Sequence, residues 1–206
     1  MAPHHATAAA RRAATGVREL RRLETRARLF EAAIDEIGRR GLAAADVSAI
    51  AGAAGVVRGT FYFHFPTKEH VLIELERKEE TRIVTELGEI QGDLLPVLSQ
   101  VVPYVVAAER RLGAIVFRDM LGLHFSSARP VESELPRHPL AEFLIGVIGR
   151  AQAAGQVRRD AEAGELAVFF LTGLFALLAT GVCESPTAQA LLSRYVTTIV
   201  KGMENR

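Results

Sequence analysis

The chain has 206 residues, of which 49% are hydrophobic and 24% are charged. This composition allows a buried core and excludes global disorder, and the length fits one domain or a small domain joined to a larger one. The single cysteine, Cys183, excludes an intramolecular disulfide framework and a cysteine-based zinc cluster. Aromatic residues make up only 6%, and abundant Ala and Leu favour packed helices over sheets.

Charge is divided unevenly along the chain, although the total is only +1. Residues 1–70 carry 11 Lys and Arg against 7 Asp and Glu, a net charge of +4. Residues 71–206 carry 14 against 17, a net charge of −3. This asymmetry suggests a module that binds a polyanion, joined to a module with another role.

The sequence shows no targeting or membrane segment. The first 14 residues lack the apolar stretch of a secretory signal. The most apolar run, residues 166–182, is shorter than the roughly 20 residues that a spanning helix needs, and it contains polar Thr172. We therefore expect a cytoplasmic protein with no membrane partner.

The first 66 residues predict a tail followed by three helices. Residues 1–16 lack apolar periodicity and predict a flexible basic tail. Asp46 is a favourable N-cap for a short helix over 47–54, which Gly55 stops, and a second short helix is predicted over 57–63. A longer first helix precedes them and ends near Arg40, with Gly41 as its C-cap. Its apolar stripe follows helical spacing: Leu20, Leu23, Ala27, Phe30, Ile34 and Ile37.

The rest of the chain also reads as helical. Thr67 caps a long helix that runs to about Gly88, and four or five further helices follow, separated by Gly-, Pro- and Ser-containing loops. No segment shows the alternation of a strand. The predicted fold is all-α with about nine helices. Its expected parts are a tail (1–16), a three-helix helix-turn-helix domain (17–66) and a helical ligand-binding and dimerisation domain (67–206).

The second short helix carries the chemistry of a nucleic-acid contact. Arg58, Thr60, Tyr62, His64 and Lys68 are hydrogen-bond donors within 11 residues. Phosphate oxygens only accept hydrogen bonds, and an Arg can also donate two hydrogen bonds to a guanine. A glycine between the first two of these donors lets the helix approach base edges closely.

The stretch GLAAADVSAIAGAAGVVRGTFYFHFPTKEHVL, residues 41–72, resembles the helix-turn-helix of the TetR family. Family members share a pattern such as V-x-x-I-A-x-x-A-G-V-[ST]-x-G-[TS]-[FL]-Y-x-[HY]-F-x-[SNT]-K-[ED], and the likeness covers roughly residues 20–75. Val57 departs from the pattern, because a Ser or Thr that would cap the second helix is usual there; a thymine methyl is a possible new partner for it. Asp46 and Ala45 also replace the usual hydroxyl residues, which puts phosphate contacts at positions 45, 46 and 57 in doubt.

The resemblance implies a role for each matching residue. Arg58, Gly59 and Thr60 would face bases or nearby phosphates, and Phe63 would lie against the groove wall. Tyr62, His64 and Lys68 would hold phosphates, and Ser48 would contact the DNA backbone or a base. The DNA partner would be a double-stranded inverted repeat. The full expected DNA-binding set is Ser48, Val57, Arg58, Gly59, Thr60, Tyr62, Phe63, His64 and Lys68.

The C-terminal part offers weaker signals. Tyr104, Arg118, His124 and Cys183 are candidates to line an effector cavity, although each is as easily a surface or packing residue. We expect no metal site and no cofactor, because His124, His138 and Asp119 lack the i, i+4 spacing of a helical metal pair. The apolar helices at 161–182 and 186–203 predict a homodimer interface rather than only a core of the monomer. Its candidate residues are Leu166, Phe170, Leu174, Leu178, Leu192, Tyr195, Val196 and Ile199.

These features predict a repressor of transcription that releases a palindromic operator when it binds a small, hydrophobic effector. Two alternatives stay open: an activator of the same fold, and an architectural DNA-binding protein that responds to no ligand. Catalysis is not expected, because the sequence has no nucleophile–base pair, metal cluster or phosphate loop.

Overall fold

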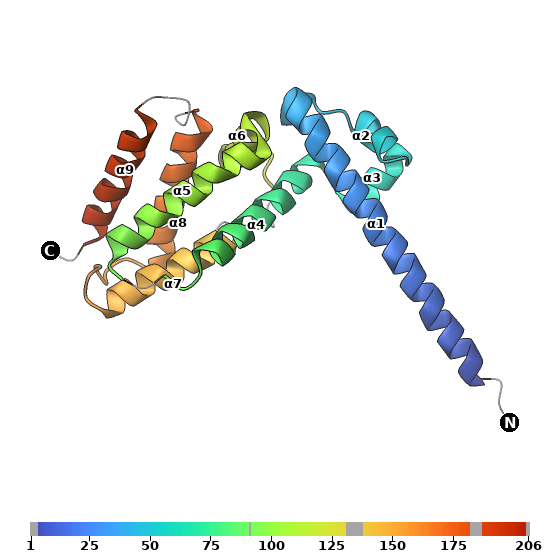
Figure 1. The fold of residues 1–206 in the computed structure, drawn as a ribbon, viewed down its shortest axis with the longest axis horizontal. Helices are drawn as coiled ribbons and strands as arrows, with labels where there is room; N and C mark the ends of the chain where they lie inside the picture. Colours follow the sequence, from blue (N-terminus) through green and yellow to red (C-terminus); the bar gives the residue numbers. More distant parts are fainter. Residues whose placement is uncertain (1–3, 91, 131–137, 182–186, 205–206) are drawn as a thin grey trace. The chain divides into compact units, whose positions relative to one another are not determined.

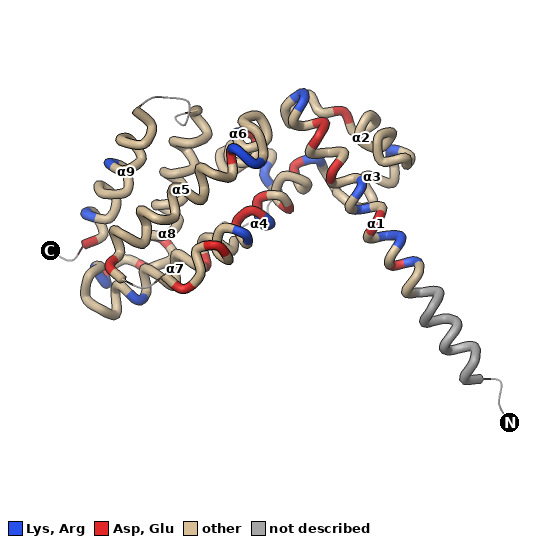
Figure 2. Tube along the Cα trace, in the orientation of Figure 1, with Lys and Arg blue, Asp and Glu red and all other residues tan. Residues whose placement is uncertain are grey.

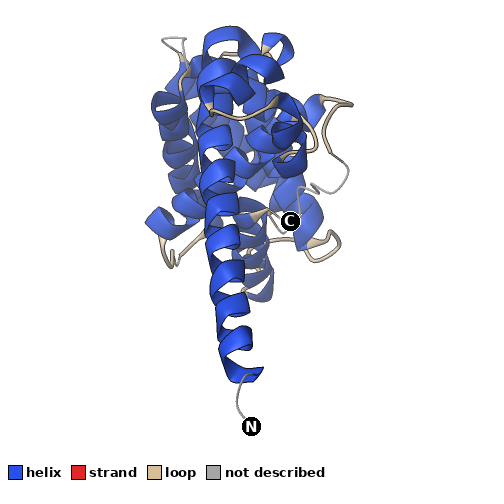
Figure 3. Cartoon of the chain, turned by 90° about the vertical axis from the view of Figure 1, so that its right-hand side faces the viewer, coloured by secondary structure: helices blue, strands red, loops and turns tan. Residues whose placement is uncertain are grey.

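The computed structural model describes residues 4–90, 92–130, 138–181 and 187–204. Within these ranges the chain contains nine α-helices and one short 3₁₀ helix, and no strand is present (Figures 1 and 3). This confirms the predicted all-α class. No helix among the described residues is both long and apolar enough to cross a membrane. The chain divides into two compact units, one ending at Val71 and the other beginning at Leu72.

The N-terminal unit is built from α1 (His4–Ala44), α2 (Val47–Ala53) and α3 (Arg58–His64). Gly41 interrupts α1 with a φ of +76°, a conformation that glycine adopts without strain. Where the sequence predicts a flexible tail over residues 1–16, α1 instead begins at His4; alanine is abundant in this segment and has the highest helix propensity. The apolar stripe of α1 enters the core from Leu29 onward, whereas Leu20 and Leu23 are exposed.

An aromatic cluster fills the core of this unit. The ring centroid of Phe65 lies 5.7 Å from that of Phe61 and 6.4 Å from that of Phe30. The guanidinium of Arg26 covers the Phe65 ring at 4.1 Å, which screens the edge of the cluster from water. Phe61 and Phe65 therefore fix α3 and the segment after it against α1.

The C-terminal unit consists of a helical bundle, and the first four residues of its first helix, α4, lie before the division between the units. α8 packs against α6, α7 and α9, and α5 packs against α6, α7 and α9. The elements are α4 (Lys68–Leu87), α5 (Leu94–Leu112), α6 (Ala114–Gly122), the 3₁₀ helix η1 (Leu123–Phe125), α7 (Pro139–Ala153), α8 (Ala163–Ala179) and α9 (Ala188–Met203).

The central position of α8 corrects the expected dimer interface. Six of the eight side chains assigned to that interface are buried within a single chain, because α8 is apolar nearly all round and is enclosed by three neighbouring helices. Only Tyr195 and Ile199 on α9 remain partly exposed. The six buried side chains are Leu166, Phe170, Leu174, Leu178, Leu192 and Val196.

Candidate nucleic-acid interface

The helix α3 has one buried and one exposed face. Phe61 is fully buried, whereas Phe63 is 74% exposed and Val57 is 75% exposed. Arg58 and Tyr62 lie on the exposed side as well. Large apolar side chains that lie together on an exposed surface mark interaction sites, so this face is suited to contact another molecule.

The turn between α2 and α3 sets the position of that face. Gly55 has a φ of +69°, and the backbone N–H of Val56 donates a 2.9 Å hydrogen bond to the carbonyl of Ala51. Ile50, Ala51 and Ala54 are buried, so α2 packs closely under the turn. At the start of α2, the side chain of Asp46 accepts a 2.8 Å hydrogen bond from the backbone N–H of Ser48. These local interactions hold α3 in a fixed orientation on the unit.

The first turn of α3 presents an ordered arginine. The Arg58 Nη2 atom lies 3.3 Å from the Tyr62 hydroxyl, and the guanidinium carbon lies 5.8 Å from the centre of the Tyr62 ring. A Cβ atom placed on Gly59 would meet nothing within 4 Å, so space beside the arginine is open. Val57, the N-cap, offers no side-chain hydrogen bond to the helix. The backbone amides at this end of α3 therefore lack a side-chain cap, as the departure at position 57 predicts.

His64 lies at the end of α3 and is half-buried, with its ring against Phe63 at 5.1 Å. Burial lowers its pKa from the usual value, and the charges of Arg26 and Arg22 lower it further. Its Nδ1 atom is buried and has no hydrogen-bond partner in the described structure. The ring is therefore neutral at pH 7, and it would bind a phosphate as a neutral donor unless the phosphate raised its pKa.

Lys68 already has a structural role in the N-terminal unit. Its Nζ donates hydrogen bonds to the carbonyl of Ala43 at 2.9 Å and to the carbonyl of Ala45, 3.4 Å away. These carbonyls stand at the end of α1, where orphan acceptors need a donor. The ammonium has three N–H groups, so a phosphate contact of the kind implied by the resemblance would have to use the third.

The positive charge of α1 is partly neutralised within the helix. Figure 2 shows basic and acidic residues interspersed along α1, and several of them pair. Glu19 binds Arg22 at 2.7 Å, and the buried Glu36 binds Arg39 at 2.9 Å and Arg40 at 3.2 Å. Because these charges on α1 are paired, the exposed hydrogen-bond donors of α3 are better placed than α1 to bind an anion.

Known proteins share both the helix-turn-helix sequence and the fold of this chain. Residues 29–75 match the family model described as bacterial regulatory proteins, tetR family. The HTH-type transcriptional regulator AcrR of Shigella flexneri is 32% identical over 100 residues, which cover 43% of this chain and 45% of that protein. The match thus spans less than half of the curated relative.

Residues 29–75 thus carry a helix-turn-helix of the TetR-family type. Solved structures of TetR-type regulators share the fold of the chain at low identity. A regulator from Shewanella sp. PV-4 is 19% identical with a TM-score of 0.66, and the match covers 88% of this chain and 99% of the other. RolR in complex with resorcinol is 18% identical with a TM-score of 0.68 and 90% coverage of both chains. The fatty acid degradation regulator FadR of Bacillus halodurans is 23% identical with a TM-score of 0.57, and the match covers 88% and 97%.

Of the effector residues expected from the sequence, the three that the structure describes do not come together. Arg118 is exposed on α6, where its Nε donates to the carbonyl of Ala114 in its own helix. Tyr104 is half-buried on α5, and Cys183 lies outside the described residues. Of the three that the structure describes, His124 alone has a buried side chain, and it faces a polar cluster rather than an open cavity.

Two sizeable cavities are present among the described residues of the C-terminal unit. One of about 690 Å³ lies where the α4–α5 connection meets α7, with Val97, Phe143 and Val147 in its apolar wall and Arg150 and Gln156 at its polar edge. A second, of about 500 Å³, lies between α5 and α9. Both have the size of a small-molecule site.

A buried polar cluster, which is not among the sites expected from the sequence, joins α4, η1 and α7. Glu76 and Glu80 lie one turn apart on α4, and their side chains meet His138, the N-cap residue of α7. His124 hydrogen-bonds Glu76, and the Arg129 guanidinium lies 3.2 Å from the same carboxylate. Burial raises the pKa of Glu80, and the charge of Glu76 adds to that effect. Burial also acts to raise the pKa of Glu76, but the hydrogen bond from His124 and the nearby charges lower it overall.

Proposed function

We propose that the protein is a ligand-responsive repressor of transcription that binds an inverted-repeat operator as a homodimer. The observation that carries the proposal is the exposed face of α3, where Arg58, Tyr62 and Phe63 point away from the core although two of them are aromatic. The match of residues 29–75 to the TetR family supports the same role.

The face of α3 suits the major groove of DNA. An α-helix fits that groove, and an arginine in the first turn can bind guanine O6 and N7 together. Gly59 adds no side chain between the helix and the bases, and Val57 offers an apolar surface to a thymine methyl. Ser48, Thr60, Tyr62, His64 and Lys68 would then contact phosphates or adjacent bases from around this face.

The homodimer would form through the outer surface of α8 and α9. Phe169 on α8 is 63% exposed, and Tyr195 and Ile199 on α9 are partly exposed, so an apolar surface remains after the monomer has folded. Substituting Phe169→Glu should place a charge in this interface and raise the dissociation constant of the dimer. Sedimentation equilibrium would measure the change; a wild-type chain that is monomeric at micromolar concentration would contradict the dimer.

The effector would be a small apolar or amphipathic molecule held in the C-terminal unit. The 690 Å³ cavity has the size and the apolar wall for such a ligand, and Arg150 and Gln156 could orient its polar end. Two proteins of similar fold point in the same direction: RolR was solved with resorcinol, and FadR is named as a regulator of fatty acid degradation. Ligand binding would favour a conformation with weaker DNA affinity.

Selection of binding sites from a random pool of double-stranded DNA tests the proposal. The full chain should enrich one palindromic sequence whose half-sites are about one helical turn apart, roughly 34–36 Å. Enrichment of no sequence would instead indicate an architectural DNA-binding protein. A reporter gene placed behind the enriched sequence separates the two regulatory roles, because a repressor lowers its expression and an activator raises it.

A further inference from the structure

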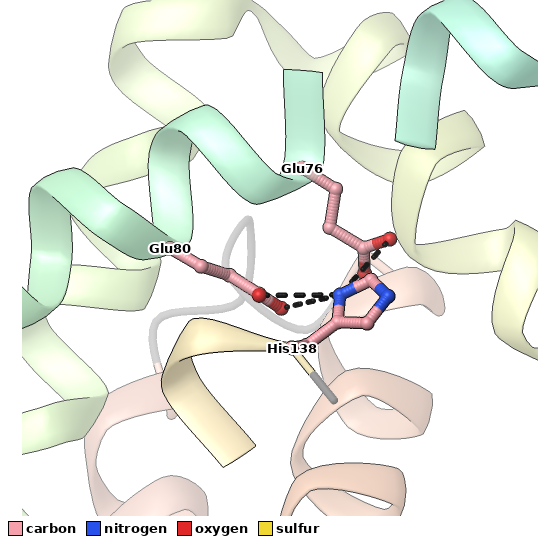
Figure 4. A group of neighbouring side chains, drawn as sticks. All are labelled: Glu76, Glu80 and His138. Atoms are coloured by element: carbon pink, nitrogen blue, oxygen red, sulfur yellow. Dashed lines mark hydrogen bonds and ion pairs between the residues drawn. The ribbon is translucent and has the colours of Figure 1, made fainter. Parts of the chain in front are cut away.

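The cluster at Glu76, Glu80 and His138 brings together two carboxylates of α4 and the imidazole of the N-cap residue of α7, side chains of types that can bind a metal ion. The two carboxylates project from successive turns of α4 toward the imidazole of His138 (Figure 4). One ligand atom from each residue can be chosen so that all three lie within 4.8 Å of one another. The three residues are buried, with exposed fractions of 2%, 4% and 0%.

We propose that Glu76, Glu80 and His138 bind a divalent transition-metal ion. Imidazole nitrogen and carboxylate oxygen are the ligands with which proteins hold Zn²⁺ and related ions such as Co²⁺. The described residues of the site all belong to the C-terminal unit, so the proposal does not rest on the DNA-binding role proposed above.

The distances between the ligand atoms fit a tetrahedral site. The Nδ1 atom of His138 lies 3.2 Å from Oε2 of Glu80 and 3.8 Å from Oε2 of Glu76. With metal–ligand bonds of about 2.0–2.2 Å, two ligand atoms of a tetrahedral ion are roughly 3.3–3.6 Å apart. The two distances to His138 therefore lie within a few tenths of an ångström of this range, and the two carboxylates, whose chosen oxygens lie within 4.8 Å of each other, would close on the ion by up to about an ångström. The fourth position would hold water or a donor atom of a bound small molecule.

A second layer of side chains orients the proposed ligands. His124 hydrogen-bonds Oε1 of Glu76, the oxygen that is not turned toward His138. Outer hydrogen bonds of this kind hold ligating carboxylates in place and are typical of protein metal sites. The N-cap position of His138, directly before Pro139, places its backbone at the start of α7.

The position of Arg129 is the main argument for an alternative, in which the cluster is only a network of buried ion pairs. Its Nη2 atom lies 3.2 Å from Oε2 of Glu76 and 3.3 Å from Nε2 of His138. A neutral His138 that binds an ion through Nδ1 carries its proton on Nε2, so Arg129 has to turn away when the ion binds. The single positive charge of the guanidinium also compensates the two buried carboxylates less fully than a divalent ion would. When the ion binds, it therefore replaces Arg129 as the cationic partner of Glu76 and also binds Glu80.

Titration of the full-length, metal-stripped protein with Co²⁺ tests the proposal directly. The adjacent His4 and His5 could bind metal on their own, so every protein in the experiment should carry alanine at both positions. We expect one Co²⁺ per chain, with the intense visible absorption of a tetrahedral ion and displacement by Zn²⁺. Absence of saturable binding at millimolar Co²⁺ would overturn the proposal, and the measurement needs neither DNA nor effector.

Variants of the cluster identify the ligands. Glu80→Gln and His138→Gln should each weaken Co²⁺ binding by more than about 100-fold, because loss of an outer partner alone costs about 10–100-fold. His124→Gln, which removes such an outer partner, should fall within that lower range. Glu74→Gln is the matched control: it removes a carboxylate from the same helix outside the cluster and should leave the affinity unchanged within about threefold.

Circular dichroism of each metal-free variant shows whether it is folded. If Glu80→Gln or His138→Gln does not fold, the His124→Gln variant and the wild-type absorption spectrum still decide the question. Unchanged affinity in every folded cluster variant, or a wild-type spectrum of an octahedral hydrated ion, would assign the bound Co²⁺ to another place and overturn the proposed site.

Discussion

The ring of Tyr195 on α9 lies against Gly173 on α8, and its hydroxyl donates a 2.6 Å hydrogen bond to the carbonyl of Phe170. A Cβ atom built on Gly173 would lie only 2.9 Å from Cε2 of this ring and closer still to the hydroxyl. The absence of a side chain at position 173 thus allows the two last helices to approach each other.

Replacing Gly173 with alanine should destabilise the protein, although alanine is the better helix former. We expect Gly173→Ala to lower the free energy of unfolding by about 1–3 kcal/mol, because the new methyl group overlaps the Tyr195 ring. Gly164→Ala on the same helix is the control, since its Cβ would make only an ordinary contact of 4.0 Å with Ile145. Urea unfolding measures both, and equal stability of the two variants would contradict the close packing.

Tyr195 should also titrate later than an ordinary tyrosine. Burial raises its pKa to about 12, whereas the unfolded value is 10.0. Its contribution to stability is therefore fully present below pH 10 and is lost as the pH rises through about 12. Absorbance at the tyrosinate band should show that one of the three tyrosines ionises near pH 12, and that Tyr195→Phe removes this step. If no tyrosine ionises above its ordinary range, the Tyr195 hydroxyl is not buried.

We expect the protein to lose stability in weakly acidic solution because of His64. Its folded pKa lies below the unfolded value of 6.5, first because it is buried and then because Arg26 and Arg22 repel a further positive charge. The stabilising contribution is present above pH 6.5 and is lost as the pH falls through the folded pKa. Thermal unfolding between pH 7.5 and 5 should depend less on pH in His64→Gln than in the wild type. Identical pH profiles of the variant and the wild type would show that folding does not shift the pKa of His64.

Lys68 is expected to have two separable effects. Its ammonium binds the carbonyls of Ala43 and Ala45, so Lys68→Ala should lower the free energy of unfolding by about 1–2 kcal/mol. The exposed Lys78 on the same helix serves as the control, and Lys78→Ala should cost less than about 0.5 kcal/mol. If Lys68 also binds a phosphate, its substitution reduces the slope of log affinity against log salt by about 1 or slightly more per dimer. An unchanged slope would leave Lys68 with the structural role alone.

The local structure of the DNA-binding unit was predictable because its signals lie within a few residues of each other. Asp46 caps α2, Gly55 has the positive φ of a tight turn, and α3 begins one residue later than predicted. The side-chain contact of Lys68 was not predictable, because the carbonyl of Ala43 lies 25 residues away in the chain.

The features of the C-terminal unit depend on long-range packing and were predicted less well. The apolar helix α8 has no polar face, so its sequence alone did not show that Phe170 and Leu174 face the core of the same chain. The buried cluster does leave a signal in the sequence, because Glu76 and Glu80 interrupt the otherwise apolar stripe of α4 at helical spacing. The pairing of these carboxylates with His138, 58 residues from Glu80, required the folded structure.

The central claim is that α3 reads DNA bases, and Arg58 tests it most directly. The wild-type protein should select from random DNA a palindrome with a guanine at symmetric positions of its two half-sites. Arg58→Ala should lose the preference at those positions, worth about 1–3 kcal/mol per base pair, and keep most of its nonspecific affinity. Lys68→Ala, by contrast, should weaken all sequences alike. If Arg58→Ala selects the same bases as the wild type, Arg58 does not read the operator, and the account of α3 as the reading helix through this residue is contradicted.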